Sequence, residues 1–287
     1  MKKKILITGA RGFFGTRFIN RYRNEFDILG LDVEQLDITN KSAVDTTFAE
    51  FKPDFVIHAA AIAVTDFCNQ HPDIAHKVNV QGAINVANAC KANGSKLVFI
   101  STEQVFNGNI EAGPYSEQDT PVPDTVYGQN KLEAEGELRS ILEDMWILRF
   151  TWLFGLPERN TTINPNVVWN AMQALTNGEV MQERRNEFRG LTYVHELIEQ
   201  FPKIFTIPYG TYHTGANNPA SRYEIAEHIL TELGQQSRLD HLLQVNDARK
   251  TRDVRLNTNK LAGQGVVFTE SKAAITKCLQ EFHYISA

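Results

Sequence analysis

Three cysteines are few for a chain of 287 residues, and they lie far apart. Cys68, Cys90 and Cys278 are odd in number and show no paired spacing. Such a set excludes a disulfide framework or a cysteine-based zinc site as the basis of the fold. We therefore expect three reduced thiols in a cytosolic protein.

Long apolar runs and tracts of one charge are also missing. No apolar run approaches the roughly 20 residues of a membrane-spanning helix. The net charge is -5, with 29 Lys and Arg against 34 Asp and Glu and no basic tract. The Lys2-Lys3-Lys4 run precedes only Ile5-Leu6-Ile7, which is too short for the apolar region of a signal peptide. These absences predict a cytoplasmic protein with neither a membrane nor a nucleic acid as partner.

The histidines do not form a metal-binding pattern. His195-Glu196-Leu197-Ile198-Glu199 lacks the second histidine of a His-Glu-x-x-His site. His71 and His76 are five residues apart and do not share a helical face. No metal site is predicted.

The first half of the chain alternates short apolar runs with amphipathic segments. This rhythm predicts an α/β, Rossmann-like, doubly wound parallel sheet with helices on both faces. The expected strands are 3–8, 27–31, 55–58, 96–101 and 145–149, and the expected helices are 12–23, 41–51, 72–93 and 126–142.

After about Trp152 the alternation breaks into shorter, less regular segments. We expect an NAD(P)-binding domain over residues 1–156, with later segments around 191–213 returning to it. Residues 157–287 are expected to be a smaller, mainly substrate-binding portion that acts as a lid. Within it, a helix over 221–233 should begin with a capping box formed by Ser221 and Glu224.

A glycine-rich segment follows the first expected strand. It reads Thr8-Gly9-Ala10-Arg11-Gly12-Phe13-Phe14-Gly15 and opens the first expected helix. Glycines at this turn allow a pyrophosphate to approach the amides at the helix N-terminus and let the helix pack closely on the strand. The segment predicts a dinucleotide site.

Two side chains bear on which dinucleotide binds. Asp32, at the end of the second strand, can accept hydrogen bonds from an adenosine ribose and would repel a 2′-phosphate. Arg11 could instead reach that phosphate, or it could be a solvated surface residue. The choice between NAD(H) and NADP(H) therefore stays open.

A tyrosine and a lysine four residues apart share one face of the helix over 126–142. An ammonium group at Lys131 would favour the phenolate of Tyr127 and so lower its pKa. Such a tyrosine can give a proton to a carbonyl oxygen while hydride arrives at carbon. Ser101-Thr102 places hydroxyls at the carboxyl edge of the sheet, where ligands bind in open α/β folds.

Together these positions resemble the extended short-chain dehydrogenase/reductase superfamily, most closely the dTDP-4-dehydrorhamnose reductase family. The similar segments span most of the chain: Thr8-Gly9-x-x-Gly12-x-x-Gly15, Leu36-Asp37-Ile38-Thr39, His58-Ala59-Ala60-Ala61, Val78-Asn79-Val80, residues 101–108, 149–155 and 252–261.

The resemblance implies reduction of a nucleotide-activated 4-keto-6-deoxysugar by NAD(H) or NADP(H). Tyr127 would be the general acid, Lys131 would hold the nicotinamide ribose, and Thr102 would polarise the carbonyl. The implied cofactor-binding residues are Gly9, Arg11, Gly12, Phe13, Phe14, Gly15, Asp32, Asp37, Ile38, Ala59, Ala60, Ala61, Tyr127 and Lys131. The implied substrate-binding residues are Thr102, Glu103, Gln104 and Trp152, the last either packing on the sugar or base or being structural.

Several positions depart from the family pattern. Gln104 stands in place of a tyrosine, Glu103 and Asn107 in place of aspartates, and Arg189-Gly190-Leu191-Thr192-Tyr193 in place of Gly-Ser-Pro-Thr-Tyr. The loop from Asp32 to Asp37 is also short. All but the short loop concern the substrate side, so they bear on the sugar more than on the hydride chemistry.

Other functions remain open. A sugar-nucleotide epimerase would use the same residues with tightly held NAD. The regulatory subunit of methionine adenosyltransferase also resembles this family and binds cofactor while serving another enzyme. The oligomeric state is open too, with a homodimer through the 126–142 helix as one arrangement.

Overall fold

The computed structural model describes residues 2–247 and 250–286, which fall into two compact units. The first unit comprises residues 1–110, 119–150 and 204–212, and the second comprises 111–118, 151–203 and 213–287. The functional division expected from the sequence, with its boundary after residue 156, stays a prediction.

The first unit is built on a six-stranded sheet in the order β10-β5-β4-β3-β1-β2, in which β1 to β5 pair in parallel. Its elements are β1 (Lys4–Thr8), α1 (Phe13–Tyr22), β2 (Asp27–Leu31), α2 (Lys41–Phe51), β3 (Phe55–His58), α3 (Thr65–Gln70), α4 (Pro72–His76), a π-helix (Lys77–Gly82), α5 (Ala83–Asn93), β4 (Lys96–Thr102), a 3-10 helix (Glu103–Phe106), α6 (Val126–Ile141), β5 (Met145–Phe150), a 3-10 helix (Phe201–Thr206) and β10 (Gly210–Thr214).

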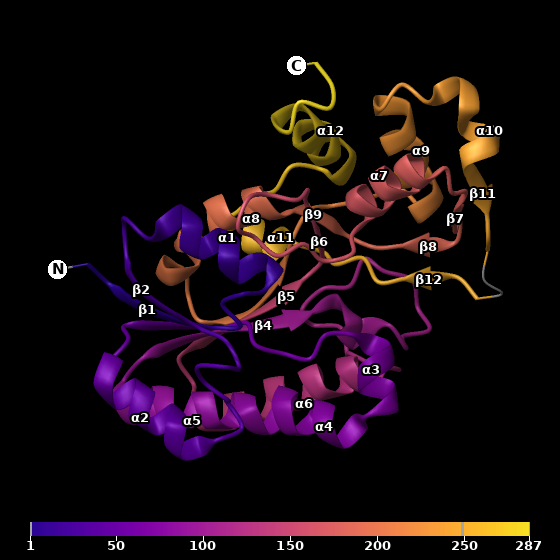
Figure 1. The fold of residues 1–287 in the computed structure, drawn as a ribbon. Helices are drawn as coiled ribbons and strands as arrows, with labels where there is room; N and C mark the ends of the chain where they lie inside the picture. The colour runs from indigo at the N-terminus through magenta and orange to yellow at the C-terminus, as the bar shows by residue number, and fades with distance from the viewer. Residues whose placement is uncertain (1, 248–249, 287) are drawn as a thin grey trace. The chain divides into compact units, whose positions relative to one another are not determined.

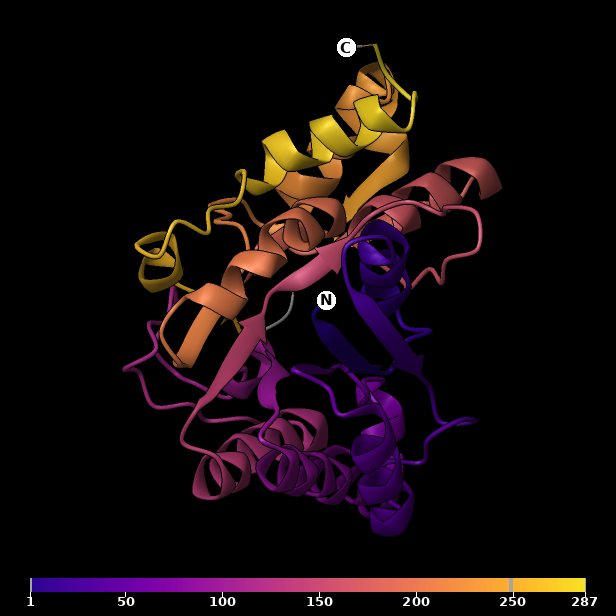
Figure 2. The ribbon, with the colours of Figure 1, turned by 90° about the vertical axis from the view of Figure 1, so that its left-hand side faces the viewer.

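Helices cover both faces of this sheet, as predicted. In Figures 1 and 2, α2, α5 and α6 lie side by side along one face and α1 lies on the other. Between them the strands carry a fully buried apolar core that includes Leu6, Val56, Leu97 and Phe99. The doubly wound α/β fold predicted from the strand–helix rhythm is confirmed.

The strand order reverses between β1 and β3, because β2 lies on one side of β1 and β3 to β5 lie on the other. Ligands of open α/β sheets bind at the carboxyl ends of the strands at such a switch point. Here the ends are Thr8 and His58, whose Oγ1 and Nδ1 atoms are 2.6 Å apart.

The helix expected over 72–93 contains a π-helical stretch that the sequence did not predict. Within it, Asn79 is buried, and its side chain both accepts from the Ile62 amide (2.8 Å) and donates to the Ile62 carbonyl (3.0 Å). The widened turn therefore lets a helix residue hold the segment that follows β3. Periodicity could not show this, because the partner is distant in sequence.

The second unit contains smaller elements around a core of its own. They are β6 (Trp152–Phe154), α7 (Val167–Asn177), β7 (Met181–Glu183), β8 (Glu187–Phe188), β9 (Leu191–Tyr193), α8 (Val194–Gln200), α9 (Arg222–Glu232), a 3-10 helix (Gln236–Arg238), α10 (Leu239–Leu242), β11 (Leu243–Val245), β12 (Arg252–Asp253), α11 (Asn259–Ala262) and α12 (Ser271–Glu281). Two-stranded pairs join β11 to β7, β12 to β8 and β6 to β9. The Ser221–Glu224 capping box of α9 is present, as predicted.

Candidate active site

The glycine segment forms a tight turn between β1 and α1. Gly9 has φ +71°, and a Cβ there would lie 2.7 Å from the Ala60 nitrogen. A Cβ on Gly15 would lie 2.7 Å from the Gly9 carbonyl oxygen, which also accepts from the Gly12 amide at 3.0 Å. Only glycine fits at Gly9 and Gly15 without displacing backbone.

The N-terminus of α1 suits an anionic group. No side chain caps it, and its first turn carries no acidic residue. The rings of Phe13 and Phe14 are buried, so these two residues can offer a ligand only their backbone amides. Uncapped amides and the helix dipole favour a phosphate at this point. The residues present therefore fit the pyrophosphate of a dinucleotide.

Acidic groups gather beside this turn at the end of β2. The Asp32 carboxylate accepts from the Arg11 amide (3.0 Å) and the Val33 amide (2.9 Å), which fixes its position. The Arg11 guanidinium pairs with Glu34 at 2.6 Å, and both side chains are exposed. The structure thus places Arg11 and Asp32 together, and it adds Glu34, which sequence reasoning missed.

Asp37 and Ile38 follow the β2 end of the sheet, with the Asp37 side chain exposed and the Ile38 side chain buried. The Asp37 carboxylate accepts from the amide and hydroxyl of Thr39, which lowers its pKa. The Ile38 side chain is buried over Gly82, so a Cβ on Gly82 would lie 2.6 Å from its Cδ1. The cofactor-binding role expected for both residues stays a prediction.

The segment after β3 links the glycine turn to Tyr127. Ala59 and Ala60 lie against Gly9, with the Ala59 amide donating to the Thr8 carbonyl at 3.2 Å. Ala61 packs in the cluster that contains Tyr127 and Cys68. The expected cofactor segment therefore runs from one group of candidate residues to the other.

Thr102, Tyr127 and Lys131 come together at the carboxyl end of β4. Thr102 is the last residue of β4, and its side chain hydrogen-bonds with Tyr127, which lies in the first turn of α6. Lys131 is one turn further along α6, buried, with its Nζ 3.9 Å from the centroid of the Phe99 ring. The three residues predicted to be catalytic thus share one buried face.

The charges at this face differ from the sequence-based expectation. Burial is the largest effect on Tyr127 and raises its pKa above the usual range, while the Thr102 hydrogen bond opposes this. Burial lowers the pKa of Lys131 to about 7, although the nearby Glu135 raises it. Lys131 was expected to lower the Tyr127 pKa; the net shift is instead upward, because desolvation is the largest effect and the charges of Cys68 and Glu103 add to it.

His58 is a polar neighbour of this face that the sequence did not single out as a site residue. Burial and the Lys131 charge lower the His58 pKa to about 3, so the imidazole is neutral at physiological pH. Its ring stacks on Phe99, and its Nε2 has no hydrogen-bond partner among the described residues. A neutral ring beside Lys131 avoids a second buried charge.

The expected substrate residues belong to different units. In the first, Glu103 is buried, and the Gln104 side chain accepts from the Thr65 hydroxyl at 3.4 Å. In the second, Trp152 is half-buried, and the guanidinium groups of Arg189 and Arg222 lie 4.6 and 5.4 Å from its ring centroid. Trp152 is therefore part of an arginine-rich cluster of the second unit.

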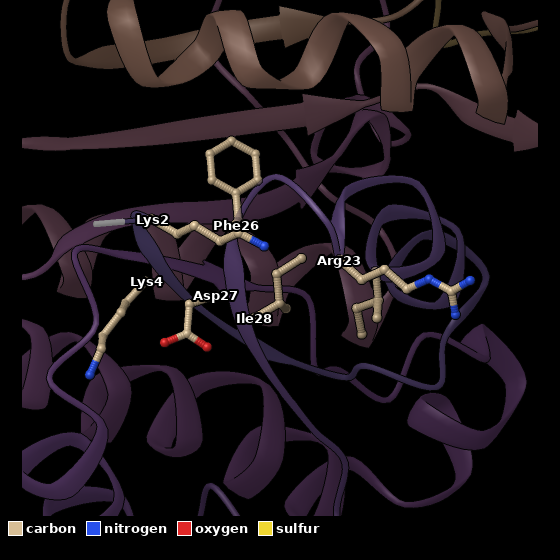
Figure 3. Close-up of a pocket in the computed structure, with 7 residues that line it drawn as sticks. Lys2, Lys4, Arg23, Phe26, Asp27 and Ile28 are labelled. Atoms are coloured by element: carbon tan, nitrogen blue, oxygen red, sulfur yellow. The ribbon is translucent and has the colours of Figure 1, made fainter.

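A hollow of about 490 Å³ lies elsewhere in the first unit. Figure 3 shows Lys2, Arg23, Phe26 and Asp27 around it, at the amino ends of β1 and β2. This is the end of the strands opposite the glycine turn, away from the edge where α/β sheets hold ligands. It is not the candidate active site.

Residues 2–247 and 250–286 show neither a metal-binding cluster nor a membrane-spanning helix. No three His, Cys, Asp or Glu side chains gather there as a metal could require. Over the same ranges, none of the helices combines the length and apolar character needed to cross a membrane.

Replacing Lys131 by Met tests the burial of its charge. The Lys131 pKa is about 7 in the folded protein against an ordinary 10.5, so the parent gains stability as pH rises between these values. Lys131→Met should be more stable than the parent at pH 6.5, and this advantage should shrink by up to ~1.4 kcal/mol per pH unit towards pH 10. Urea unfolding at several pH values measures it.

The control is Lys91→Met, on the exposed side of α5. A difference between Lys131→Met and parent that stays constant from pH 6.5 to pH 10 would show that the Lys131 charge is not desolvated.

Comparison with known proteins identifies relatives over most of the chain. The family model described as RmlD substrate binding domain matches residues 2–284. A dTDP-4-dehydrorhamnose reductase of Aggregatibacter actinomycetemcomitans is 32% identical in an alignment that covers 85% of this chain and 83% of that protein. Methionine adenosyltransferase 2 subunit beta of Bos taurus is 27% identical in an alignment that covers 92% of this chain and 83% of that protein.

A solved structure agrees with these relatives. The crystal structure of dTDP-4-dehydrorhamnose reductase from Bacillus anthracis str. Ames in complex with NADP is 28% identical. It superposes with a TM-score of 0.83 over 98% of this chain and 99% of that one. The resemblance inferred from the motifs is confirmed, and the chain belongs to the family described by the RmlD substrate binding domain.

Proposed function

We propose that the protein is an NAD(P)H-dependent reductase of a nucleotide-activated 4-keto-6-deoxysugar. One observation carries this proposal: Thr102, Tyr127 and Lys131 share a buried face at the same sheet edge as the glycine turn. The solved relative with NADP and the dTDP-4-dehydrorhamnose reductase relative support the cofactor and the substrate class.

In this proposal the first unit holds the cofactor. The amides at the start of α1 would bind the pyrophosphate, Asp32 the adenosine ribose and Lys131 the nicotinamide ribose. When bound, the dihydronicotinamide supplies the hydride for the sugar carbonyl.

Tyr127 would supply the proton. Its raised pKa keeps the hydroxyl protonated at neutral pH, as a general acid in the reducing direction requires. After the proton leaves, the phenolate would be stabilised by the Thr102 hydrogen bond and by the Lys131 ammonium. Lys131 therefore acts on the product state of the proton transfer more than on the resting tyrosine.

The proposed substrate-binding residues are Thr102, Glu103 and Gln104 of the first unit and Trp152 of the second. Arg189 beside Trp152 supplies positive charge of the kind that binds a diphosphate, whereas Arg222 is ion-paired with Glu183 at 2.9 Å. We place the reaction in the cytoplasm, consistent with three buried cysteines that are free thiols.

A regulatory role is the second candidate, because methionine adenosyltransferase 2 subunit beta is a relative over 92% of this chain. It predicts a stoichiometric enzyme partner on purification and no reduction across a panel of dTDP-, UDP- and GDP-ketosugars. Release of oxidised cofactor on denaturation would instead indicate an epimerase.

Removing the Tyr127 hydroxyl tests the proposed acid. Tyr127→Phe should lower kcat for ketosugar reduction by about 10²- to 10⁴-fold, the usual contribution of a positioned acid. NAD(P)H affinity, measured by fluorescence titration, should change little. Tyr284→Phe removes an exposed tyrosine hydroxyl and is the control. Parental kcat in Tyr127→Phe would show that another group donates the proton.

Glu34 is expected to influence the choice of dinucleotide. Glu34→Gln releases Arg11 from its 2.6 Å ion pair and removes a negative charge near the position of a 2′-phosphate. The ratio of the NADPH Kd to the NADH Kd should fall about two- to fivefold, the size expected of an exposed charge pair.

The matched control for this change is Glu25→Gln, which removes the exposed acid partner of Arg21 on the same unit. An unchanged ratio in Glu34→Gln would mean that Arg11 does not face the 2′ position.

A further inference from the structure

The buried face of α6 continues beyond the two predicted catalytic residues. Tyr127, Lys131 and Glu135 follow at four-residue steps, and their exposed fractions fall from 9% to 2% to 0%. Four-residue neighbours lie above one another on a helix. Glu135 is therefore the residue directly behind Lys131 on this face.

Glu135 is held by both neighbouring strands. The Ser101 hydroxyl on β4 donates to its Oε1 at 2.6 Å, and Arg149 on β5 donates from Nε (2.9 Å) and Nη2 (2.7 Å) to its two oxygens. Ser101 and Arg149 lie opposite each other in the β4–β5 register. Ser101 also immediately precedes Thr102, so the contacts fix α6 one residue away from the end of β4.

Stability alone is a poor explanation for this cluster. A buried ion pair often stabilises a fold no more than apolar residues of the same size, because both charges lose their hydration. Arg149 is 3% exposed and Glu135 fully buried, so this cost applies in full. Together with the Ser101 hydrogen bond, the pair does, however, fix α6 against β4 and β5, and α6 and β4 carry the three candidate residues.

We propose that Glu135 is a positioning residue that, anchored by Ser101 and Arg149, holds Lys131 and Tyr127 beside β4 and favours the charged form of Lys131. The inference rests on the proposed function, since it assigns Lys131 a role in holding the cofactor and stabilising the Tyr127 phenolate.

The surrounding charges support the second part of this role. The titratable groups near Lys131 are His58 on β3 and Tyr127 and Glu135 on α6. Behind Glu135 lie Arg149 on β5 and the half-exposed Arg139 on α6, whose Nη2 is 3.6 Å from Glu135 Oε2. Cys68 on α3 and Glu103 after β4 lie beside Tyr127. His58 is neutral. Glu135 is the negative group that raises the Lys131 pKa against the effect of burial.

Glu135→Gln tests the charge, and it should leave the side chain close to its parental shape. The Lys131 pKa, about 7 in the parent, should fall by about one unit, which lowers the charged fraction at pH 7 roughly fivefold. NMR of ¹³Cε-labelled lysine in the cofactor-free protein, assigned with Lys131→Met, measures this without turnover.

Glu135→Asp tests the position, because it keeps the charge but shortens the reach to Ser101 and Arg149. The Lys131 pKa should stay within about half a unit of the parent. NADH affinity and, in a panel of dTDP-, UDP- and GDP-ketosugars, kcat should each fall at least threefold. This variant also decides the question if Glu135→Gln does not fold.

The matched control is Glu133→Gln, on the exposed side of α6, where its partner is His76. It should match the parent in every readout. A parental Lys131 pKa in Glu135→Gln, or parental NADH affinity in Glu135→Asp, would overturn the proposal. A lower Lys131 pKa in Glu135→Gln and weaker NADH binding in Glu135→Asp, without any ketosugar reduction by the parent, would support the positioning role and reject the proposed function.

Discussion

The burial of the Lys131 ammonium group is the constraint on which the candidate site depends. A charge enclosed between Phe99, His58 and α6 must be compensated by its neighbours. The carboxylate of Glu135 supplies the opposite charge, and the neutral imidazole of His58 adds no second positive charge. The same burial keeps Tyr127 protonated, so one physical condition sets the charge state of both residues.

The two ends of the proposed cofactor site carry opposite charge. At the end of β2, Asp32 and Glu34 contribute negative charge around one paired arginine, while Lys131 is the cation at the end of β4. The segment after β3 joins them, because Ala60 touches Gly9 and Ala61 packs with Tyr127. The contact between Thr8 and His58 joins the carboxyl ends of β1 and β3, where the strand order reverses.

Local signals in the sequence predicted much of this arrangement. The strands over 27–31 and 55–58, the helix over 41–51 and the α9 capping box depend on apolar periodicity and capping residues, which act over a few positions. What the sequence did not predict depends on distant partners. The π-helical turn at Asn79, the Glu34–Arg11 pair and the upward shift of the Tyr127 pKa each require a neighbour, or a degree of burial, that only the folded chain supplies. The four-residue spacing between Lys131 and Glu135 was the sequence feature that could have identified Glu135 as a neighbour of Lys131 on the same helix face.

The central claim is that this face transfers a hydride to a sugar carbonyl while Tyr127 gives the proton. Its most direct test uses NADH and NADPH that carry deuterium at both hydrogen positions of the nicotinamide C4, with a panel of dTDP-, UDP- and GDP-4-ketosugars, and mass spectrometry and NMR of the products. The account predicts a product that is one mass unit heavier, with deuterium at C4 of the sugar from one face of the ring. A protein that binds the labelled cofactor but transfers no deuterium to any of these sugars would contradict it.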